Sequence, residues 1–446
     1  MSVGSFIFDQ YDFNAASGLL RLHYRFENGP SFIEKIMFPV PTVALSPERQ
    51  TALDGAFRLI LLLAGVSYYK AYAPEDLVCG AFALDEETAN FMARIYRKGL
   101  AEFYFRNKLE LDRPLRFKTE NVTARAANPL GLRRHALIPV GGGKDSIVTL
   151  ETLKRAQEPA TLFALGSASG IAAPIEATIK QSGLHALRVE RTLWPELIEL
   201  NKAAVFNGHV PITAILSAIA VATAILHDCD AVILSNEYSA NAPNLRMNEF
   251  EINHQYSKSL DFERNFASYV AAHIAKDLRY FSLLRPFSEV EIARRFAHHT
   301  QYHPIFRSCN KAFKQDGNAR ATQWCCNCPK CRFVFLALAP FVDKPHMIEI
   351  FGKNMLDDAT QLEGFAELCG LANYKPFECV GEVEESFSLV QKLSRDENWK
   401  NDLIVKNLTA QLNGTPDFDD HYRALFAPHA DHHVPEEYVR MLDADH

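Results

Sequence analysis

Residues 135–146 read HALIPVGGGKDS, and this stretch indicates the fold class. Its first part, 135–140, is an apolar run of strand length that stops at three consecutive glycines. Asp145 and Ser146 follow, and the apolar residues of 147–156 are spaced as one face of a helix. The stretch therefore predicts a strand, a tight glycine loop and the start of a helix in direct succession.

The same alternation continues downstream. Further runs of strand length lie at 160–165, 185–193 and 231–234. Helical stretches lie at 175–181, 212–226, 262–278 and, from the capping-box match Ser288-x-x-Glu291, about 288–299. Strands that alternate with helices predict a parallel sheet with helices on both faces, which is a doubly wound α/β fold.

The residues before this region follow a different pattern. Residues 19–26 roughly alternate as a half-buried strand does, whereas 57–66 and 91–105 have helical periodicity. The polar, basic stretch 119–134 contains Asn128-Pro129-Leu130-Gly131 and predicts a boundary loop. We predict four regions, in chain order: an N-terminal α+β domain (1–130), the α/β domain (131–300), a cysteine-rich subdomain (301–382) and a helical C-terminal tail (383–446) with a loop at 413–417.

Composition excludes several classes of protein. The 446 residues carry 47 Lys and Arg against 54 Asp and Glu, a net charge of −7, which argues against non-specific nucleic-acid binding. The N-terminus lacks a charged region followed by an apolar run, so no secretory signal is expected. The longest apolar run, 212–226, is shorter than the ~20 residues that span a bilayer, so no membrane is expected as a partner.

Cysteine usage points to a cellular compartment. Four of the nine cysteines crowd into 325–331, whereas a secreted disulfide framework would spread them along the chain. This crowding favours a metal site in a reducing environment. We therefore expect a cytoplasmic protein.

The glycine loop has the chemistry of a phosphate site. It consists of Gly141, Gly142, Gly143, Lys144, Asp145 and Ser146. Glycines let backbone N–H groups approach an anion, and the following helix N-terminus adds donors and partial positive charge. Lys144 adds a full charge, Ser146 adds a hydroxyl group, and Asp145 is placed to hold Mg²⁺ against phosphate oxygens. The spacing fits neither the Walker loop nor the dinucleotide fingerprint, and a tight turn in which glycines serve geometry alone is the alternative.

The cysteine cluster has metal-ligand spacing. Cys309 is followed by a C-x2-C-x2-C run at Cys325, Cys328 and Cys331. Four thiolates complete the tetrahedral sphere of a structural zinc, and an iron–sulfur cluster uses similar ligands. Cys326 lies inside the run and is an alternative to Cys309. A nucleic-acid zinc ribbon is a further alternative, but only one half of the cluster has the x2 spacing and its basic flank is thin.

Both motifs resemble one superfamily. Residues 141–146 resemble the Ser-Gly-Gly-x-Asp-Ser loop of the ATP pyrophosphatase (PP-loop, HUP-like) superfamily, with Gly141 where that loop usually has Ser. The cysteine cluster after the nucleotide domain is similar to the zinc site of 7-cyano-7-deazaguanine synthases. The resemblance implies that 131–300 binds ATP with Mg²⁺ and that 301–382 is a zinc subdomain with a segment of the substrate site.

Within the superfamily, the chain looks like the ATP-dependent UDP-N-acetylmuramoyl-L-alanyl-L-glutamate epimerases of bacterial cell-wall synthesis. The resemblance runs from about residue 55 to 410. It rests on the strings at 63–68, 131–137, 141–146, 207–209, 235–237, 253–255, 278–280, 328–331, 333–341 and 375–382. It implies a UDP-linked dipeptide as substrate, adenylation of its glutamyl carboxylate, release of AMP and pyrophosphate, and inversion of the α-carbon. The superfamily also contains ligases that adenylate other carboxylates or nucleobases, which is the alternative function.

The base that removes the α-proton is not fixed by these motifs. Besides Lys144 and Asp145, the candidate catalytic residues are His209, Glu237, His254, Lys258 and Cys379, which follow strand or helix ends downstream of the loop. On a helix, His254 and Lys258 would share a face. Each candidate has a structural alternative: Glu237 as a ligand of Mg²⁺ or ribose, for example, and Cys379 as a small buried hydrophobe. Arg133 and Arg134 are expected either to bind nucleotide phosphates or to lie on a solvated face. The sequence does not indicate an oligomeric state.

Overall fold

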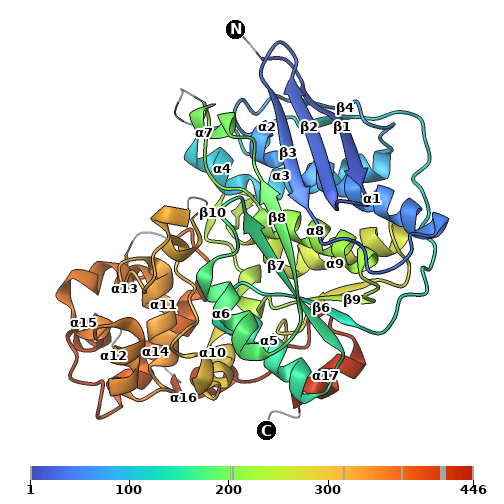
Figure 1. The fold of residues 1–446 in the computed structure, drawn as a ribbon. Helices are drawn as coiled ribbons and strands as arrows, with labels where there is room; N and C mark the ends of the chain where they lie inside the picture. The colour runs from blue at the N-terminus through green and yellow to red at the C-terminus, as the bar shows by residue number, and fades with distance from the viewer. Residues whose placement is uncertain are drawn as a thin grey trace.

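A ten-stranded sheet runs through the computed structural model, which describes residues 3–200, 202, 205–314, 317–372, 375–411 and 418–443. The strands are β1 (Phe6–Asn14), β2 (Leu19–Phe26), β3 (Ser31–Met37), β4 (Asp76–Cys79), β5 (Arg116–Lys118), β6 (Ala136–Pro139), β7 (Ala160–Ser167), β8 (Ala186–Thr192), β9 (Ala231–Leu234) and β12 (Arg279–Ser282). Their order is β12-β9-β6-β7-β8-β3-β2-β1-β4-β5 (Figure 1). The loop predicted at 413–417 lies outside the described residues.

The parallel half of this sheet confirms the predicted strands of the α/β region. β12, β9, β6, β7 and β8 are mutually parallel, with Ala136 opposite both Ala160 and Ala231. On the other side of β8, β3 pairs antiparallel and continues into β2 and β1. One sheet therefore crosses the predicted boundary near residue 130, and the domain limits themselves stay a prediction.

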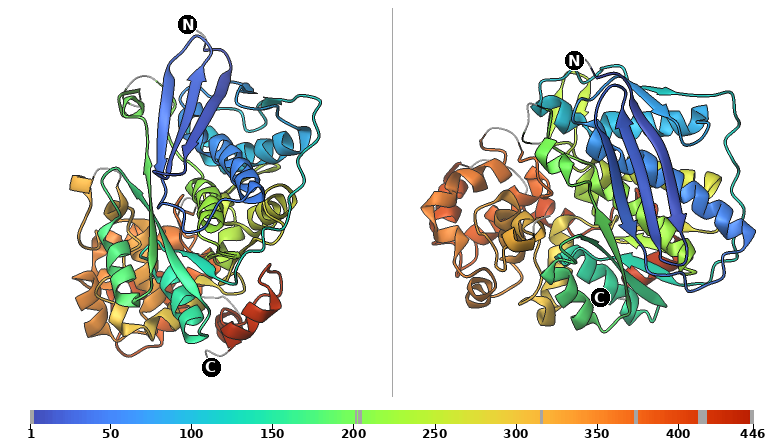
Figure 2. Two further views of the ribbon diagram at one scale, coloured as in Figure 1. Left: turned by 45° about the vertical axis from the view of Figure 1, so that its right-hand side comes forward. Right: turned by 45° about the horizontal axis from the view of Figure 1, so that its top comes forward.

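Helices cover both faces of the parallel half (Figures 1 and 2). One face carries α5 (Lys144–Arg155), α6 (Ala173–Ser182) and α10 (Glu289–Ala297), and the other carries α1 (Pro47–Ala64), α8 (Ile212–Leu226) and α9 (Leu260–His273). Alternate side chains of each strand serve the two cores: Ala231 and Ile233 pack with the first set, and Val232 and Leu234 with the second. The doubly wound arrangement expected from the alternation is present.

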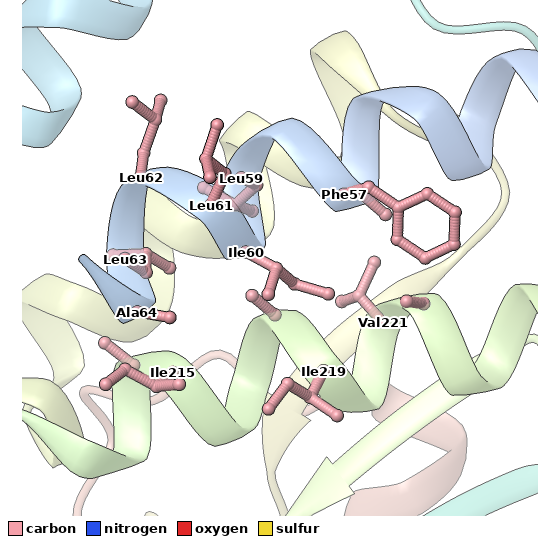
Figure 3. Packing of buried hydrophobic residues seen from close by; sticks show 14 of the residues in the cluster. Phe57, Leu59, Ile60, Leu61, Leu62, Leu63, Ala64, Ile215, Ile219 and Val221 are labelled. Atoms are coloured by element: carbon pink, nitrogen blue, oxygen red, sulfur yellow. The ribbon is translucent and has the colours of Figure 1, made fainter. Parts of the chain in front are cut away.

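The centre of the second core is the contact between α1 and α8 (Figure 3). Phe57, Ile60 and Ala64 of α1 lie against Ile215 and Val221 of α8. Together, α1 and α2 (Val66–Tyr69) form an apolar helical stretch of 23 residues. This stretch is longer than the helix predicted at 57–66, and it is also longer than the apolar run at 212–226. It is the one helix among the described residues that is long and apolar enough to cross a membrane, but 78% of its apolar window is buried in the protein, as in a core helix.

Among the described residues, seven α-helices lie at or after the cysteine cluster. They are α11 (Pro329–Leu338), α12 (Lys344–Phe351), α13 (Leu362–Leu368), α14 (Val383–Ser394), α15 (Leu403–Gln411), α16 (Phe418–Ala424) and α17 (Glu436–Asp443). In Figures 1 and 2, α11 to α15 form one group beside α10, and α17 lies apart from it, next to α5. Trp399 and Leu408 are buried in the core that also contains Phe335, so helices on either side of the boundary predicted at residue 382 pack together.

The remaining elements complete the chain. They are α3 (Glu86–Gly99), α4 (Ala101–Arg106), α7 (Glu196–Leu200), the hairpin of β10 (Leu245–Met247) and β11 (Phe250–Ile252), and short 3-10 turns that include η2 (Tyr256–Lys258). The helix predicted at 91–105 is thus two helices. Ser288 caps α10 as predicted, since its hydroxyl accepts from the N–H of Glu291, but the Glu291 carboxylate binds Arg294 and Arg295.

Candidate functional site

The glycine loop lies between β6 and α5, and its backbone leaves little room for a side chain at two of its three glycines. Gly142 has a left-handed φ of +70°, and a Cβ there would lie 2.9 Å from the backbone carbon of Pro174. A Cβ on Gly143 would lie 2.8 Å from the Oγ of Ser308. At Gly141 a Cβ would meet nothing within 4 Å, so the serine usual in the PP-loop fits this backbone. Gly142 is therefore required by its backbone conformation and packing, whereas a side chain at 143 needs only a shift of the Ser308 hydroxyl.

This loop borders a cavity of about 350 Å³ at the carboxyl ends of β6 and β9. The chain leaves β6 toward β7 on one side, and β9 lies on the other, so the cavity is at the point where the strand order reverses. Doubly wound sheets bind ligands at this point. Polar and charged residues of the lining include Asp145, Ser146, Ser235, Asn236, Glu237, Lys258, Arg307, Ser308, Asn310 and Lys330.

Within the described part of the chain, no side chain caps the helix N-terminus at the cavity. Gly143 is the N-cap of α5 and makes no side-chain cap hydrogen bond. The Ser146 hydroxyl donates to the carbonyl of Gly143, 3.1 Å away, and accepts a long contact from the N–H of Gly141. The first N–H groups of α5 are thus available to an anion, as the sequence predicted for a phosphate site.

Three carboxylates meet beside the loop. Asp145, Glu237 and Glu289 offer oxygens that lie within 4.8 Å of one another. The Lys144 ammonium is buried and binds both Asp145 and Glu289, which raises the pKa of Lys144 despite its burial. Burial, opposed by Lys144, raises the pKa of Glu289 to about 8. Carboxylate oxygens are the ligands that Mg²⁺ prefers, so this donor set fits the magnesium predicted at Asp145.

A second polar cluster contains His254. The Nδ1 of His254 donates to Oε2 of Glu102 over 2.5 Å, and Oε1 of Glu102 accepts from Arg106 over 2.6 Å. The ring of His209 lies 4.5 Å from that of His254, and its Nδ1 is 3.5 Å from the same Glu102 oxygen. Burial lowers the pKa of His209 to about 3, so this ring is neutral.

His254 and Lys258 do not share a helix face, because His254 precedes the single 3-10 turn η2 in which Lys258 lies. Both nevertheless act on the Cys379 thiol, Lys258 through its charge and His254 as a close polar neighbour. Cys379 is only half-buried, and its polar surroundings differ from those of the small buried hydrophobe considered above. Arg133 and Arg134 are not in the cavity lining and are paired with Asp228 and Glu158.

The predicted metal cluster is assembled. The Sγ atoms of Cys309, Cys325, Cys328 and Cys331 lie within 4.8 Å of one another, with Cys325 and Cys328 at 3.6 and 3.4 Å from Cys331. Tetrahedral zinc, with Zn–S bonds of about 2.3 Å, needs sulfur separations of roughly 3.8 Å. Cys326 instead directs its Sγ to the carbonyl of Phe351, 3.1 Å away. The four-cysteine set thus fits a zinc subdomain, and Cys326 is not one of its members.

Sequence reasoning missed several residues at these sites. Glu102 lies inside an apolar helical stretch, and Glu289 adjoins a recognised cap without being part of it. Both are buried carboxylates, but the linear sequence gives no sign of their partners, which are far away along the chain. Lys330 also lines the cavity. Its position in the Cys-Pro-Lys-Cys turn (328–331) is the sequence signal that could have indicated this role.

Taken together, the fold and the site define an α/β protein with a phosphate-type glycine loop at the switch point of a mostly parallel sheet and a four-cysteine subdomain. The family model described as the MurL N-terminal domain matches residues 1–283, and that of the MurL C-terminal domain matches residues 305–422. The chain belongs to the MurL family.

Similar curated proteins cover nearly the whole chain. A protein of Xanthomonas oryzae pv. oryzae is 42% identical over 97% of this chain and 95% of its own length. Proteins of a Micromonospora species and of Salinispora tropica are 41% and 40% identical, each over 98% of this chain and over 97% and 95% of their own lengths. All three are named UDP-N-acetyl-alpha-D-muramoyl-L-alanyl-L-glutamate epimerase, so this chain is an enzyme of the isomerase class. The predicted family is thereby confirmed, and membership of the PP-loop superfamily stays a prediction.

Proposed function

We propose that this enzyme inverts the α-carbon of the terminal L-glutamyl residue in UDP-N-acetylmuramoyl-L-alanyl-L-glutamate, a precursor of peptidoglycan, in the cytoplasm. The observation that carries the proposal is the identity of 40–42% with three epimerases of that name over 97–98% of the chain. The cavity at the glycine loop supports it, because its lining combines residues of that loop with the candidate acid–base residues Glu237 and Lys258.

We propose that the reaction needs ATP because of the low acidity of the glutamyl α-proton. The α-proton next to a free carboxylate is very hard to remove, because the resulting carbanion would lie beside an existing negative charge. Adenylation of that carboxylate removes the charge and lets the electron pair spread into the carbonyl as an enolate. A positioned base then removes the proton, and return of a proton to the other face inverts the centre. Hydrolysis of the mixed anhydride gives the D-glutamyl product, AMP and pyrophosphate.

Residues 141–146 hold the triphosphate in this proposal. Backbone N–H groups of the loop and of the first turn of α5 bind phosphate oxygens, since no side chain caps them. Asp145, Glu237 and Glu289 would hold Mg²⁺, which when bound neutralises phosphate charge. Lys144 keeps Asp145 and Glu289 together before the ion and nucleotide arrive.

The cysteine cluster has a structural role in this proposal. Cys309, Cys325, Cys328 and Cys331 would hold zinc in a closed tetrahedral site without an open position for substrate. α11 begins inside the cluster, and Lys330 of its first turn lines the cavity. The metal site would therefore fix this wall of the active site.

Chiral analysis tests the proposed function. The purified enzyme is incubated with the UDP-linked L-Ala-L-Glu substrate, Mg²⁺ and ATP, and the glutamate recovered after acid hydrolysis is resolved by enantiomer. We expect D-glutamate, with AMP and pyrophosphate, only when ATP is present. Substrate-dependent AMP without D-glutamate would indicate instead an adenylating ligase of the same superfamily.

A further inference from the structure

Glu102, His254 and Cys379 come together from distant parts of the chain, and a hydrogen bond joins the first two. Glu102 of α4 accepts from Nδ1 of His254, and Arg106 holds the other Glu102 oxygen. Asn244 ties the segment of Cys379 to His254, because it donates to the Pro376 carbonyl over 2.7 Å and accepts from the His254 N–H over 2.9 Å. The His254 ring is thereby a close polar neighbour of the Cys379 thiol. Glu102 is buried, and its two oxygens are both engaged, so the imidazole is held in one orientation with Nδ1 toward the carboxylate.

The segment that carries this thiol adjoins the cavity that contains the glycine loop. The cations that face Cys379 are Lys258 and Lys330, and both line the cavity. The neighbouring Glu378 accepts a 2.6 Å hydrogen bond from Asn310, another residue of the lining. Cys379 is half-buried, in contrast to Cys369 and Cys229, which are buried.

We propose that the Cys379 thiolate is the base that removes the α-proton of the glutamyl residue, with His254 as its polar partner and Glu102 as a positioning residue. This inference rests on the proposed epimerase function. In enzymes that use cysteine as a nucleophile, the thiolate is activated by an imidazole that a third group orients. Here the activated sulfur would take a proton from carbon.

The charges around the thiol support this assignment. Burial by itself would raise the pKa of Cys379, but Lys258, Lys330 and the His254 ring lower it to about 6. Burial lowers the pKa of His254, but its interactions with Cys379 and Glu102 raise it to about 9. The neighbouring His209 is neutral, because its pKa is lowered to about 3. At a pH between about 6 and about 9, Cys379 is therefore a thiolate and His254 is an imidazolium.

The proton transfer balances as follows. The Cα–H bond of the adenylated glutamyl residue breaks, an S–H bond forms on Cys379, and the electron pair of the broken bond becomes the enolate. Water then gives a proton to the opposite face of the α-carbon, and the hydroxide that remains takes the proton of the Cys379 thiol. The enzyme returns to its starting state, and the substrate has exchanged its α-hydrogen with solvent.

Glu102, His209 and His254 have ligand atoms within 4.8 Å of one another, and the hydrogen bond of His254 to Glu102 accounts for the approach of these two. Such spacing also occurs in metal sites, but Arg106 already occupies one Glu102 oxygen and His254 Nδ1 the other. A metal bound by these residues in the purified enzyme, in addition to that of the cysteine cluster, would contradict the assignment.

The decisive variants are Cys379→Ala and the matched control Cys79→Ala, another half-buried cysteine, whose pKa is raised by burial. In D2O with ATP and the L-Glu substrate, we expect Cys379→Ala to lose at least about 100-fold in epimerisation and α-deuteration. Substrate-dependent pyrophosphate release should continue at about the wild-type rate, because adenylation does not use the thiol. Cys79→Ala should match the wild type in all three measurements.

A wild-type rate of deuteration in Cys379→Ala would overturn the inference and leave the proposed function intact. A wild-type enzyme without ATP-dependent epimerisation would instead refute the proposed function. If Cys379→Ala does not fold, alkylation of the wild type by iodoacetamide, followed at the 379 peptide, gives an independent answer. Its rate should rise with pH through a midpoint near the pKa of about 6, and a midpoint above the ordinary thiol value would contradict the assignment.

The role of Glu102 has its own test. In Glu102→Gln, loss of the carboxylate charge lowers the pKa of His254, since that charge raises it in the wild type. The alkaline limb of the pH profile of kcat/KM should therefore move to lower pH, while the folded structure and pyrophosphate release persist. An unchanged limb would show that Glu102 does not position His254.

Discussion

At the residue scale, the carboxylate of Asp145 is the most direct test of the glycine-loop site. Asp145 lies at the cavity, close to Glu237 and Glu289 and bound by Lys144. Asp145→Asn keeps the size of the side chain but removes a ligand charge, so we expect at least about 100-fold slower pyrophosphate release. Thermal unfolding should change little, because Glu289 still pairs with the buried Lys144 ammonium. The exposed Asp112 gives the control, Asp112→Asn, for which both quantities should equal those of the wild type.

The pH dependence of the reaction follows from the Cys379–His254 pair. Cys379 must be deprotonated, which requires a pH above about 6, and His254 must stay protonated, which requires a pH below about 9. We expect kcat/KM for epimerisation to be bell-shaped with limbs near these values. The groups that set the limbs are Lys258 and Lys330 on the thiol and Glu102 on the imidazole. A profile that keeps rising to pH 10 would contradict this pairing.

Local motifs were predictable at this scale, and long-range partners were not. The glycine loop and the cysteine cluster are recognisable in the sequence because their members lie within a few positions of each other. Cys309 is the exception, since it precedes the rest of the cluster. The contact between Glu102 and His254 joins residues 152 positions apart, and Cys379 comes from a third segment. Only tertiary folding brings such groups together, so His254 and Cys379 could be named as candidates but not as partners.

At the scale of elements, the glycine loop makes a paired prediction. Gly142→Ala forces a side chain into left-handed backbone, 2.9 Å from the Pro174 backbone carbon, so we expect it to destabilise the protein by ~1–3 kcal/mol and to weaken ATP binding. Gly141→Ser meets open space and should change the free energy of unfolding by less than about 0.5 kcal/mol. Denaturant unfolding of both variants checks this, and equal effects would contradict the role given to Gly142.

The cysteine cluster makes a second paired prediction. Cys328→Ser removes one of four converging thiols, so zinc content should fall and the unfolding midpoint should drop by roughly 5–10 °C. Cys326→Ser changes a thiol that faces the Phe351 carbonyl and should keep the metal. Metal analysis with calorimetry measures both, and loss of zinc in Cys326→Ser would show that the ligand set is different.

Elements with a clear apolar run or a clear apolar periodicity were predicted well, and elements with neither were not. The helix at 212–226 and the strand at 231–234 have the predicted bounds. β4, β5 and β12 are strands of three or four residues that include charged or polar side chains, so they show neither a continuous apolar run nor a readable alternation. The helix predicted at 57–66 begins ten residues earlier, at Pro47, because Ser46 caps it and Pro47 suits the first turn, a signal that apolar spacing alone does not include.

At the scale of the whole molecule, β3 and β8 join the antiparallel and parallel parts of the sheet. A buried ion pair lies at this seam: Arg191 of β8 donates to Glu34 of β3 over 2.7 Å and also to Ser67. Arg191→Met would leave the Glu34 charge buried and unpaired, so we expect a loss of ~3–5 kcal/mol in the free energy of unfolding. The double substitution Glu34→Leu with Arg191→Met should recover much of that loss, and failure to do so would show that the pair is not what stabilises the seam.

The central claim concerns the whole enzyme: ATP is used to make the glutamyl α-proton exchangeable. The most direct measurement is mass spectrometry of the UDP-linked dipeptide after incubation in D2O with the wild-type enzyme, Mg²⁺ and ATP. The account predicts one deuterium at the glutamyl α-carbon of the D-Glu product, with none incorporated when ATP is omitted. Formation of AMP and pyrophosphate without deuterium at that carbon, or deuteration that does not need ATP, would contradict it.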